Sequence, residues 1–405
     1  MTGVGGDHHG AERIDRVRTA IRREGLDGII CQLPSNVLML SGYWPVVGTA
    51  FAVATADGQV AVLAPEDERD LADAGWAAAV ETYSPLSMND LAGPAEHVRK
   101  PLSDLLERLR LTGGTVGFED TTLFEEATYA ASFVYGQMLL PTLQAAASGR
   151  LVPMAAVMTS LRSRLTRYEV SKVGDACKVA GIAFRNASRA ICPGLREPEV
   201  ADAFQSRMVV DGLASEDVRR AGSFTFCMSG PNAALAGGAY ARTRNRKLER
   251  EDLVLVHCNS YLDGYWTDIT RTYYLGRPDE RTRSVYDAIL EARSAALEVI
   301  APGARASEVD RAARDVLDKH GLGRYFTHGI GHNVGFSAIS PDFPPRLSPV
   351  SPDVLTEGMT FNVEPAAYIE GWGGVRHCDV VTVRPNGPEV LTPFEASIED
   401  LVLGP

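Results

Sequence analysis

Residues 253–276 read LVLVHCNSYLDGYWTDITRTYYLG, and this stretch decides the fold. An apolar run, Leu253–Val256, leads to the turn signal Asp263-Gly264, and a second run rich in Tyr, Thr and Ile follows, which is the pattern of a β-hairpin. We expect the hairpin to place Asp268 opposite His257, because side chains on paired strands converge on one face of a sheet. The stretch therefore predicts a polar pair within an apolar hairpin.

A His and an Asp that face each other in this way have two interpretations. They form a buried hydrogen-bonded pair that only stabilises the sheet, or they are the ligands or proton-transfer groups of a site. Structural pairs are the more common of the two. The hairpin alone does not distinguish a structural pair from a site, so the distinction depends on the rest of the sequence.

Composition excludes several classes of partner. The 405 residues carry a formal net charge of −12, whereas nucleic acids and anionic membranes favour a basic surface. No apolar run approaches the roughly 20 residues of a membrane-spanning helix. The six cysteines form no CxxC pair, which is typical of reduced thiols in a cytosolic protein. We expect a soluble, cytoplasmic protein that acts on a small molecule or a short peptide, with no nucleic-acid and no membrane partner.

The length suits two domains. The pattern assigns a disordered leader to 1–11, an α/β domain to 12–150, a linker helix to 151–164 and a larger domain to 165–405. Amphipathic periodicity predicts helices in both domains, over 12–24, 95–111, 125–135, 166–191, 195–213, 281–300 and 306–320. Nothing in the first domain clusters His, Cys and carboxylates, so we place the site in the second.

Five motifs of the second domain carry a resemblance to a known family. They are YEVSKV (168–173), DGYWTDITRTYYLG (263–276), HGIGHNVG (328–335), NVEPAAY (362–368) and GGVRHCDVVTV (373–383). In this order they resemble the creatinase, prolidase and aminopeptidase P superfamily, M24. The resemblance implies an α+β protein, in which a C-terminal pita-bread domain is preceded by a smaller α/β domain like the creatinase N-terminal domain. It also implies a homodimer.

The resemblance implies a metal site, because metallopeptidase members of that family bind two metal ions with five side chains. Three of these positions are retained here as Asp268, His332 and Glu364. The first Asp position holds His257 and the last Glu position holds Cys378. Bridging carboxylates keep two cations about 3.5–4 Å apart, and a neutral imidazole does not bridge in that way. We expect one Zn, Mn or Fe ion, with His257 and Cys378 completing its shell, or no metal at all.

Two histidines of the peptidase members are absent. The position of the first, before the hairpin, holds Tyr240, and the position of the second, seven residues after His332, holds Ile339. Because those histidines handle protons and stabilise the reacting carbonyl, we do not expect conventional Xaa-Pro aminopeptidase activity. Tyr240 becomes a candidate hydrogen-bond partner or proton donor for the substrate.

A metal-free site is the first alternative. Creatinase resembles this scaffold and hydrolyses its substrate without metal, and its final motif reads Arg-Glu-His where this chain has Arg376-His377-Cys378. His377 or His257 is then a candidate general base that works with Glu364, and Cys378 is a candidate nucleophile. His328 is either a donor that orients its loop or a substrate contact.

The sequence therefore predicts a hydrolase of a C–N bond, of amide or amidine type, in a small polar substrate. Besides the creatinase-like hydrolase, two alternatives stay open. One is a repurposed biosynthetic enzyme that carries out an elimination or a cyclisation. The other is a peptidase-like pseudo-enzyme that acts as a binding module.

Overall fold

The computed structural model describes residues 9–89, 92–120, 139–237, 242–340, 343–394 and 396–404. The chain divides into two compact units, Met1–Arg162 and Ser163–Pro405, and each is described by itself. Within the described ranges, no helix is long and apolar enough to cross a membrane. The helix expected over 125–135 and the candidate residue Tyr240 lie outside the described residues.

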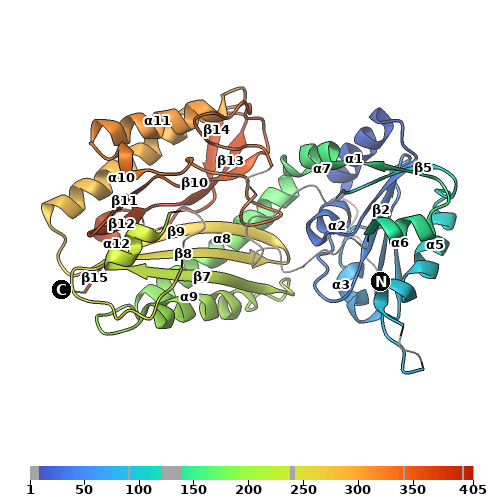
Figure 1. Ribbon diagram of the computed structural model, residues 1–405, viewed down its shortest axis with the longest axis horizontal. Helices are drawn as coiled ribbons and strands as arrows, with labels where there is room; N and C mark the ends of the chain where they lie inside the picture. Colours follow the sequence, from blue (N-terminus) through green and yellow to red (C-terminus); the bar gives the residue numbers. More distant parts are fainter. Residues whose placement is uncertain are drawn as a thin grey trace. The chain divides into compact units, whose positions relative to one another are not determined.

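The first unit is built on a six-stranded sheet with the strand order β4-β3-β2-β1-β5-β6 (Figure 1). Its strands are β1 (Gly28–Cys31), β2 (Phe51–Thr55), β3 (Val60–Pro65), β4 (Ala79–Tyr83), β5 (Thr115–Phe118) and β6 (Arg150–Pro153). Its helices are α1 (Ala11–Arg23), α2 (Pro34–Ser41), α3 (Arg69–Asp73), α4 (Pro94–His97), α5 (Arg99–Arg108), α6 (Leu139–Ala146) and α7 (Ala155–Arg162), and the short 3-10 turn η1 (Glu66–Glu68) precedes α3.

The strands of this unit are apolar because they line its hydrophobic core. Leu102 and Leu105 of α5 share one buried cluster with Val53 and Leu63 of the sheet. Residues 151–164, expected as a linker, contain most of β6, which pairs in parallel with β5, and all of α7. The β6 part of this segment therefore extends the sheet, and the rest of it forms α7.

The second unit contains two helix pairs and three small sheets, with strand orders β15-β9-β8-β7, β10-β13-β14 and β11-β12. Its helices are α8 (Arg167–Ser188), α9 (Glu197–Gly212), α10 (Glu280–Val299), α11 (Ala306–Lys319) and α12 (Ile398–Leu401), with 3-10 turns η2 (Gly230–Leu235) and η4 (Gly323–Tyr325). Its strands are β7 (Ala221–Ser229), β8 (Leu253–Leu262), β9 (Tyr265–Leu275), β10 (Thr360–Val363), β11 (Ala366–Ile369), β12 (Gly373–Arg376), β13 (Asp379–Arg384), β14 (Gly387–Val390) and β15 (Val402–Leu403). In Figure 1, α8 and α9 lie along β7–β9, and α10 and α11 lie on the side of β10–β14.

The predicted hairpin is confirmed as β8 and β9, but its register differs from the expectation. Asp263 and Gly264 both have positive φ, 47° and 85°, which suits the two-residue turn of a tight hairpin. Counted from this turn, Asp268 pairs with Asn259, and His257 pairs with Thr270. The expected placement of Asp268 opposite His257 was wrong by two residues along the strand. The two side chains still share one face and meet as diagonal neighbours.

A buried charge network lies next to this hairpin. Arg271 Nη2 donates to Asp379 Oδ1 at 2.7 Å, and Arg293 Nε of α10 donates to Asp379 Oδ2 at 2.5 Å. Arg271 Nη1 also donates to the backbone carbonyls of Thr270 and Cys378, at 2.9 and 2.8 Å. Arg271 is therefore a buried structural ion-pair partner of Asp379. The network fixes the junction of β9 with the chain between β12 and β13.

His377 belongs to this network. Its Nε2 lies 3.2 Å from Asp379 Oδ2, and burial, followed by the charge of Arg271, lowers the pKa of His377 to about 4. The ordinary pKa of a histidine is about 6.5. Between pH 6.5 and pH 4, His377 is therefore protonated in the unfolded chain but stays neutral in the folded protein. The stabilising contribution is fully present above pH 6.5 and is lost as the pH falls towards 4.

We predict that His377→Gln reduces the acid sensitivity of the fold. Wild-type stability should fall between pH 6.5 and pH 4 by about 3 kcal/mol through this residue, since each pKa unit corresponds to about 1.4 kcal/mol. The variant should lack that part of the slope. Urea unfolding of both proteins across this pH range measures it, and equal slopes would contradict the prediction.

Gly331 shows where the backbone has no room for a side chain. A Cβ at this position would overlap the backbone carbonyl of Asn362, which lies against it. The close approach lets the 330–333 segment run along β10, where Asn362 N donates to His332 O at 3.1 Å. The position of His332 therefore depends on a residue without a Cβ.

We predict that Gly331→Ala lowers the free energy of unfolding by about 1–3 kcal/mol, because the backbone must shift to admit the methyl group. Gly174 is the matched control, since it lies inside α8 with nothing within 4 Å of a Cβ. Gly174→Ala should stabilise the helix by up to about 1 kcal/mol. Chemical denaturation separates the two, and a neutral Gly331→Ala would refute the account.

Candidate functional site

Four segments of the second unit bring the candidate residues together. The hairpin supplies His257 and Asp268, and His332 comes from the irregular segment that runs beside β10. Glu364 lies between β10 and β11, and its backbone N–H donates to Ile330 O at 2.8 Å. A bridge between Thr270 and Cys378 brings the last segment against β9. The sheet register therefore gathers residues that are far apart in the sequence.

Asp268 lies between two imidazoles. His257 Nδ1 is 3.4 Å from Asp268 Oδ1, and His332 Nε2 is 3.3 Å from Asp268 Oδ2. Glu364 Oε1 lies 3.8 Å from the same His332 nitrogen. His332 Nδ1 donates to Asn333 O at 3.1 Å, which leaves Nε2 to face the two carboxylates. We call Asp268, His332 and Glu364 the acid–imidazole cluster.

The electrostatics of the cluster favour a charged pair. Burial alone would raise the pKa of Asp268, but the neighbouring imidazoles and Arg376 lower it below its usual value. Burial opposes protonation of His332, but Asp268 and Glu364 raise its pKa above the ordinary value. Burial lowers the pKa of His257 to about 4, so this imidazole is neutral near pH 7. Of the two imidazoles beside Asp268, His332 is the one that readily accepts a proton.

Cys378 is present in the site as a thiol. Its Sγ donates to Asp268 O at 3.1 Å and lies 3.8 Å from Asp268 Oδ1. Burial, followed by the charges of Asp268 and Glu364, raises its pKa well above the ordinary value. A nucleophile or a metal ligand is a thiolate, whereas these contacts stabilise the protonated form.

Asn362 lies at the centre of the cluster; it is the first residue of the NVEPAAY motif, but no role was predicted for it from the sequence. Its Oδ1 accepts from the backbone N–H of His332 at 2.7 Å, which fixes the orientation of the amide. Its Nδ2 therefore points inward, at 3.3 Å from Asp268 Oδ2, 3.2 Å from His332 Nε2 and 3.6 Å from Cys378 Sγ. One amide nitrogen is thus within hydrogen-bond distance of three of the atoms that were expected to be metal ligands.

This arrangement does not fit the metal that the family resemblance implies. A cation between Asp268 Oδ2 and His332 Nε2 would meet the N–H donors of Asn362, and Cys378 carries its proton. Among the described residues, no group of three or more His, Cys, Asp or Glu is arranged to hold a metal ion. The acid–imidazole cluster is instead closed by hydrogen bonds.

Arg376 is the second residue of the site for which no role was predicted from the sequence. The side chain is 4% exposed. Its Nε donates to Thr270 Oγ1 at 3.0 Å, and its Nη1 donates to Tyr368 OH and to Ala236 O, both at 3.2 Å. Nη1 also lies 3.9 Å from Glu364 Oε2. Arg376 is thus a buried cation beside the acid–imidazole cluster.

The remaining candidate histidines have different places. His328 Nδ1 donates to Gly329 O at 2.8 Å, so its Nε2 accepts from Tyr368 OH at 3.0 Å. Burial lowers the pKa of His328, and it supports Tyr368 as a neutral acceptor. His377 turns to Asp379 and is not brought into the cluster. Ile339 is partly buried and offers no ionisable group.

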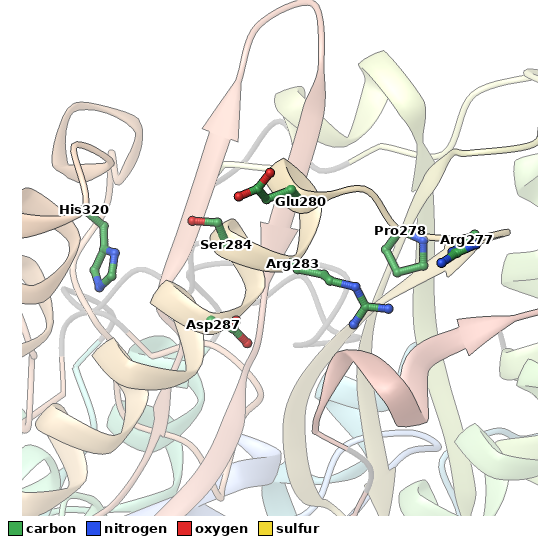
Figure 2. A pocket seen from close by; sticks show the side chains of 7 residues that line it. All are labelled: Arg277, Pro278, Glu280, Arg283, Ser284, Asp287 and His320. Carbon is green, nitrogen blue, oxygen red and sulfur yellow. The ribbon is translucent and has the colours of Figure 1, made fainter.

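A separate groove of about 500 Å³ lies at the start of α10 (Figure 2). Its lining residues are Arg277, Pro278, Glu280, Arg283, Ser284, Asp287 and His320. Arg283 pairs with Glu399 at 2.7 Å, and His320 pairs with Glu291 at 2.7 Å. Arg283 and His320 thus already have protein carboxylates as partners, and none of the lining residues belongs to the acid–imidazole cluster.

Comparison with known proteins agrees with this architecture. The model of the metallopeptidase family M24 matches residues 171–385, and the model of the creatinase/prolidase N-terminal domain matches residues 13–163. A Xaa-Pro dipeptidase of Pyrococcus furiosus is 29% identical over 390 residues, which cover 96% of this chain and 99% of the relative.

Solved structures give the same result. The prolidase of Pyrococcus horikoshii superposes with a TM-score of 0.75 at 26% identity, covering 96% of this chain and 99% of that one. A Xaa-Pro dipeptidase of Bacillus anthracis superposes with a TM-score of 0.76 at 25% identity, covering 97% and 99%. The family model spans more than half of the chain, so this protein belongs to the metallopeptidase family M24 and combines its pita-bread fold with a creatinase/prolidase N-terminal domain.

Proposed function

We propose that this chain hydrolyses a C–N bond, of amide or amidine type, in a small polar substrate or a short peptide. The observation that carries the proposal is the pairing of His332 Nε2 with Asp268 Oδ2 at 3.3 Å, beside Glu364 at 3.8 Å. Carboxylates beside an imidazole favour its protonated form and so make it a stronger base; here they face Nε2, the nitrogen that takes the proton, whereas the opposite nitrogen, Nδ1, donates to a backbone carbonyl. The relatives named above are described as acting on Xaa-Pro dipeptides, so peptide bonds are the first substrates to test.

The base of the proposed reaction is His332. In the resting site the lone pair of neutral His332 Nε2 accepts from the Asn362 amide, so the attacking water first displaces this contact. Nε2 then accepts the proton of the water as the water oxygen bonds to the substrate carbon, and Asp268 stabilises the imidazolium that forms. The tetrahedral intermediate then breaks its C–N bond, and His332 returns the proton to the leaving nitrogen. Glu364 orients the water or a substrate N–H. His332 suits this role because its side chain is 16% exposed, whereas that of His257 is 6% exposed.

The proposal changes the assignment within the metal-free alternative. His377 contacts Asp379 and is not a base for this site. His257 and Cys378 line the cluster as a neutral imidazole and a neutral thiol. The single Zn, Mn or Fe ion that the sequence favoured has no step in this route, because the amide of Asn362 bonds the atoms that would bind it. The homodimer implied by the family stays a prediction.

We predict that Asp268→Asn lowers kcat by about 10²–10⁴-fold, because the amide cannot stabilise the imidazolium of His332. Release of the amine from Xaa-Pro dipeptides, other dipeptides and small amidines provides the assay. Cys258→Ser is the matched control, since Cys258 is next to His257 but contacts Thr225 instead of the cluster. Wild-type rates in Asp268→Asn would refute the mechanism, and no turnover of any compound by the wild type would refute the proposed function.

We also predict that protein purified without added metal contains less than about a tenth of an equivalent of Zn, Mn or Fe, and that added metal does not raise its rate. Asn362→Asp should bind about one equivalent, because a third carboxylate replaces the inward N–H donors. Elemental analysis of both proteins measures this. About one equivalent in the wild type would overturn the metal-free route.

A further inference from the structure

Among the residues that the structure describes, one nitrogen of the buried Arg376 guanidinium has no hydrogen-bond partner. This nitrogen, Nη2, is covered by protein, while Nε and Nη1 of the same group donate to three acceptors. Arginine keeps its charge in a protein, so deprotonation cannot remove the cost of burying this unpaired donor. Buried polar atoms nearly always have a hydrogen-bond partner, so an unpaired one in a site indicates a ligand as the missing partner.

The neighbours of Arg376 hold its guanidinium in one orientation. Thr270 Oγ1 accepts from Nε at 3.0 Å, and Tyr368 OH accepts from Nη1 at 3.2 Å. Tyr368 is fixed in turn, because its hydroxyl donates to His328 Nε2 at 3.0 Å. A planar guanidinium that is held at two nitrogens has no freedom to turn the third towards these partners. Nη2 is therefore left without an acceptor, and because protein covers it, a ligand reaches it only when neighbouring atoms move aside.

The charge of Arg376 is placed beside the reacting groups. Glu364 Oε2 is 3.9 Å from Nη1, which is too far for a hydrogen bond. Burial opposes the charge of Arg376, but Tyr368, Glu364 and Asp268 raise its pKa. The side chains of Glu364 and His332 are 10% and 16% exposed, so the site reaches solvent on their side. Glu364 is the neighbour that His332 and Arg376 share, at 3.8 Å from His332 Nε2 and 3.9 Å from Arg376 Nη1.

We propose that Arg376 binds the carbonyl or imine heteroatom of the substrate through Nη2 and stabilises the negative charge that it acquires. The inference rests on the proposed hydrolase. As the water oxygen bonds to the carbon and its proton passes to His332, the electron pair of the C=O or C=N bond moves onto that heteroatom. When the C–N bond breaks, the pair returns. A preorganised, buried cation is well suited to this step, because its hydrogen bonds need no rearrangement.

The first test uses inorganic phosphate, a tetrahedral anion, and does not depend on turnover. Isothermal titration should show binding to the wild type, and Arg376→Met and Arg376→Lys should weaken it by about tenfold or more, because both lose the forked donors. Arg376→Lys retains the charge and is the variant to use if Arg376→Met does not fold. Arg384→Met, which removes an arginine that pairs with Glu389, is the control.

Tyr368→Phe distinguishes contact from general disturbance of the site. It removes an acceptor of Nη1 but leaves Nη2 in place, so phosphate affinity should stay within about threefold of the wild type. Absence of phosphate binding in the wild type would overturn the inference. So would unchanged binding in both Arg376 variants, or a loss in Tyr368→Phe as large as theirs.

A kinetic test separates this inference from the proposed function. With any substrate that the wild type turns over, Arg376→Lys should lower kcat by about 10²–10³-fold and change KM by less than about threefold, since the contact strengthens in the transition state. Turnover with an unchanged kcat in this variant would refute the role of Arg376 and leave the hydrolase standing. Phosphate binding that depends on Arg376 in a protein without turnover would refute the hydrolase and leave the anion site standing.

Discussion

The burial of Asp268 is the constraint on which the rest of the site depends. This carboxylate is 1% exposed, on a strand whose other residues are all buried. A charge in such a place is costly unless hydrogen bonds or opposite charges compensate it. His332, His257 and the amide of Asn362 surround it at 3.3–3.4 Å. The loop that carries His332 and the strand that carries Asn362 are thereby tied to the hairpin.

Much of the fold could be predicted because it depends on local patterns. The turn at Asp263-Gly264 and the apolar runs beside it predict the hairpin, and the five motifs predict the family. The turn also determines the register, because a two-residue turn pairs Leu262 with Tyr265 and so, three residues further along each strand, Asn259 with Asp268. The end of the α/β domain was harder to predict, because a short apolar run such as β6 has no period that separates a strand from a helix.

The site could be predicted only in part. Asp268, His332 and Glu364 meet as expected, because motifs that bind one centre in relatives keep their geometry when the fold is kept. Asn362 had a signal, since it lies two residues before Glu364, close to a residue already expected in the site. Alternation along an extended chain also separates His377 from Arg376 and Cys378. The unpaired Nη2 of Arg376 had no signal, because its partners come from elements far apart in the sequence.

The substitutions at the site form a consistent set when charges are counted. The ligand set implied by the family has four carboxylates, two Asp and two Glu, and therefore four negative charges for two cations to balance. Here His257 and Cys378 are neutral, so only Asp268 and Glu364 remain, and the count falls from four to two. Arg376 supplies one positive charge permanently, and His332 supplies a second when it is protonated. The same two side chains are the oxyanion donor and the base of the proposed reaction. His332 is neutral when it acts as the base and supplies its positive charge only after it has taken the proton, so the side-chain charges of the site become balanced as the intermediate forms.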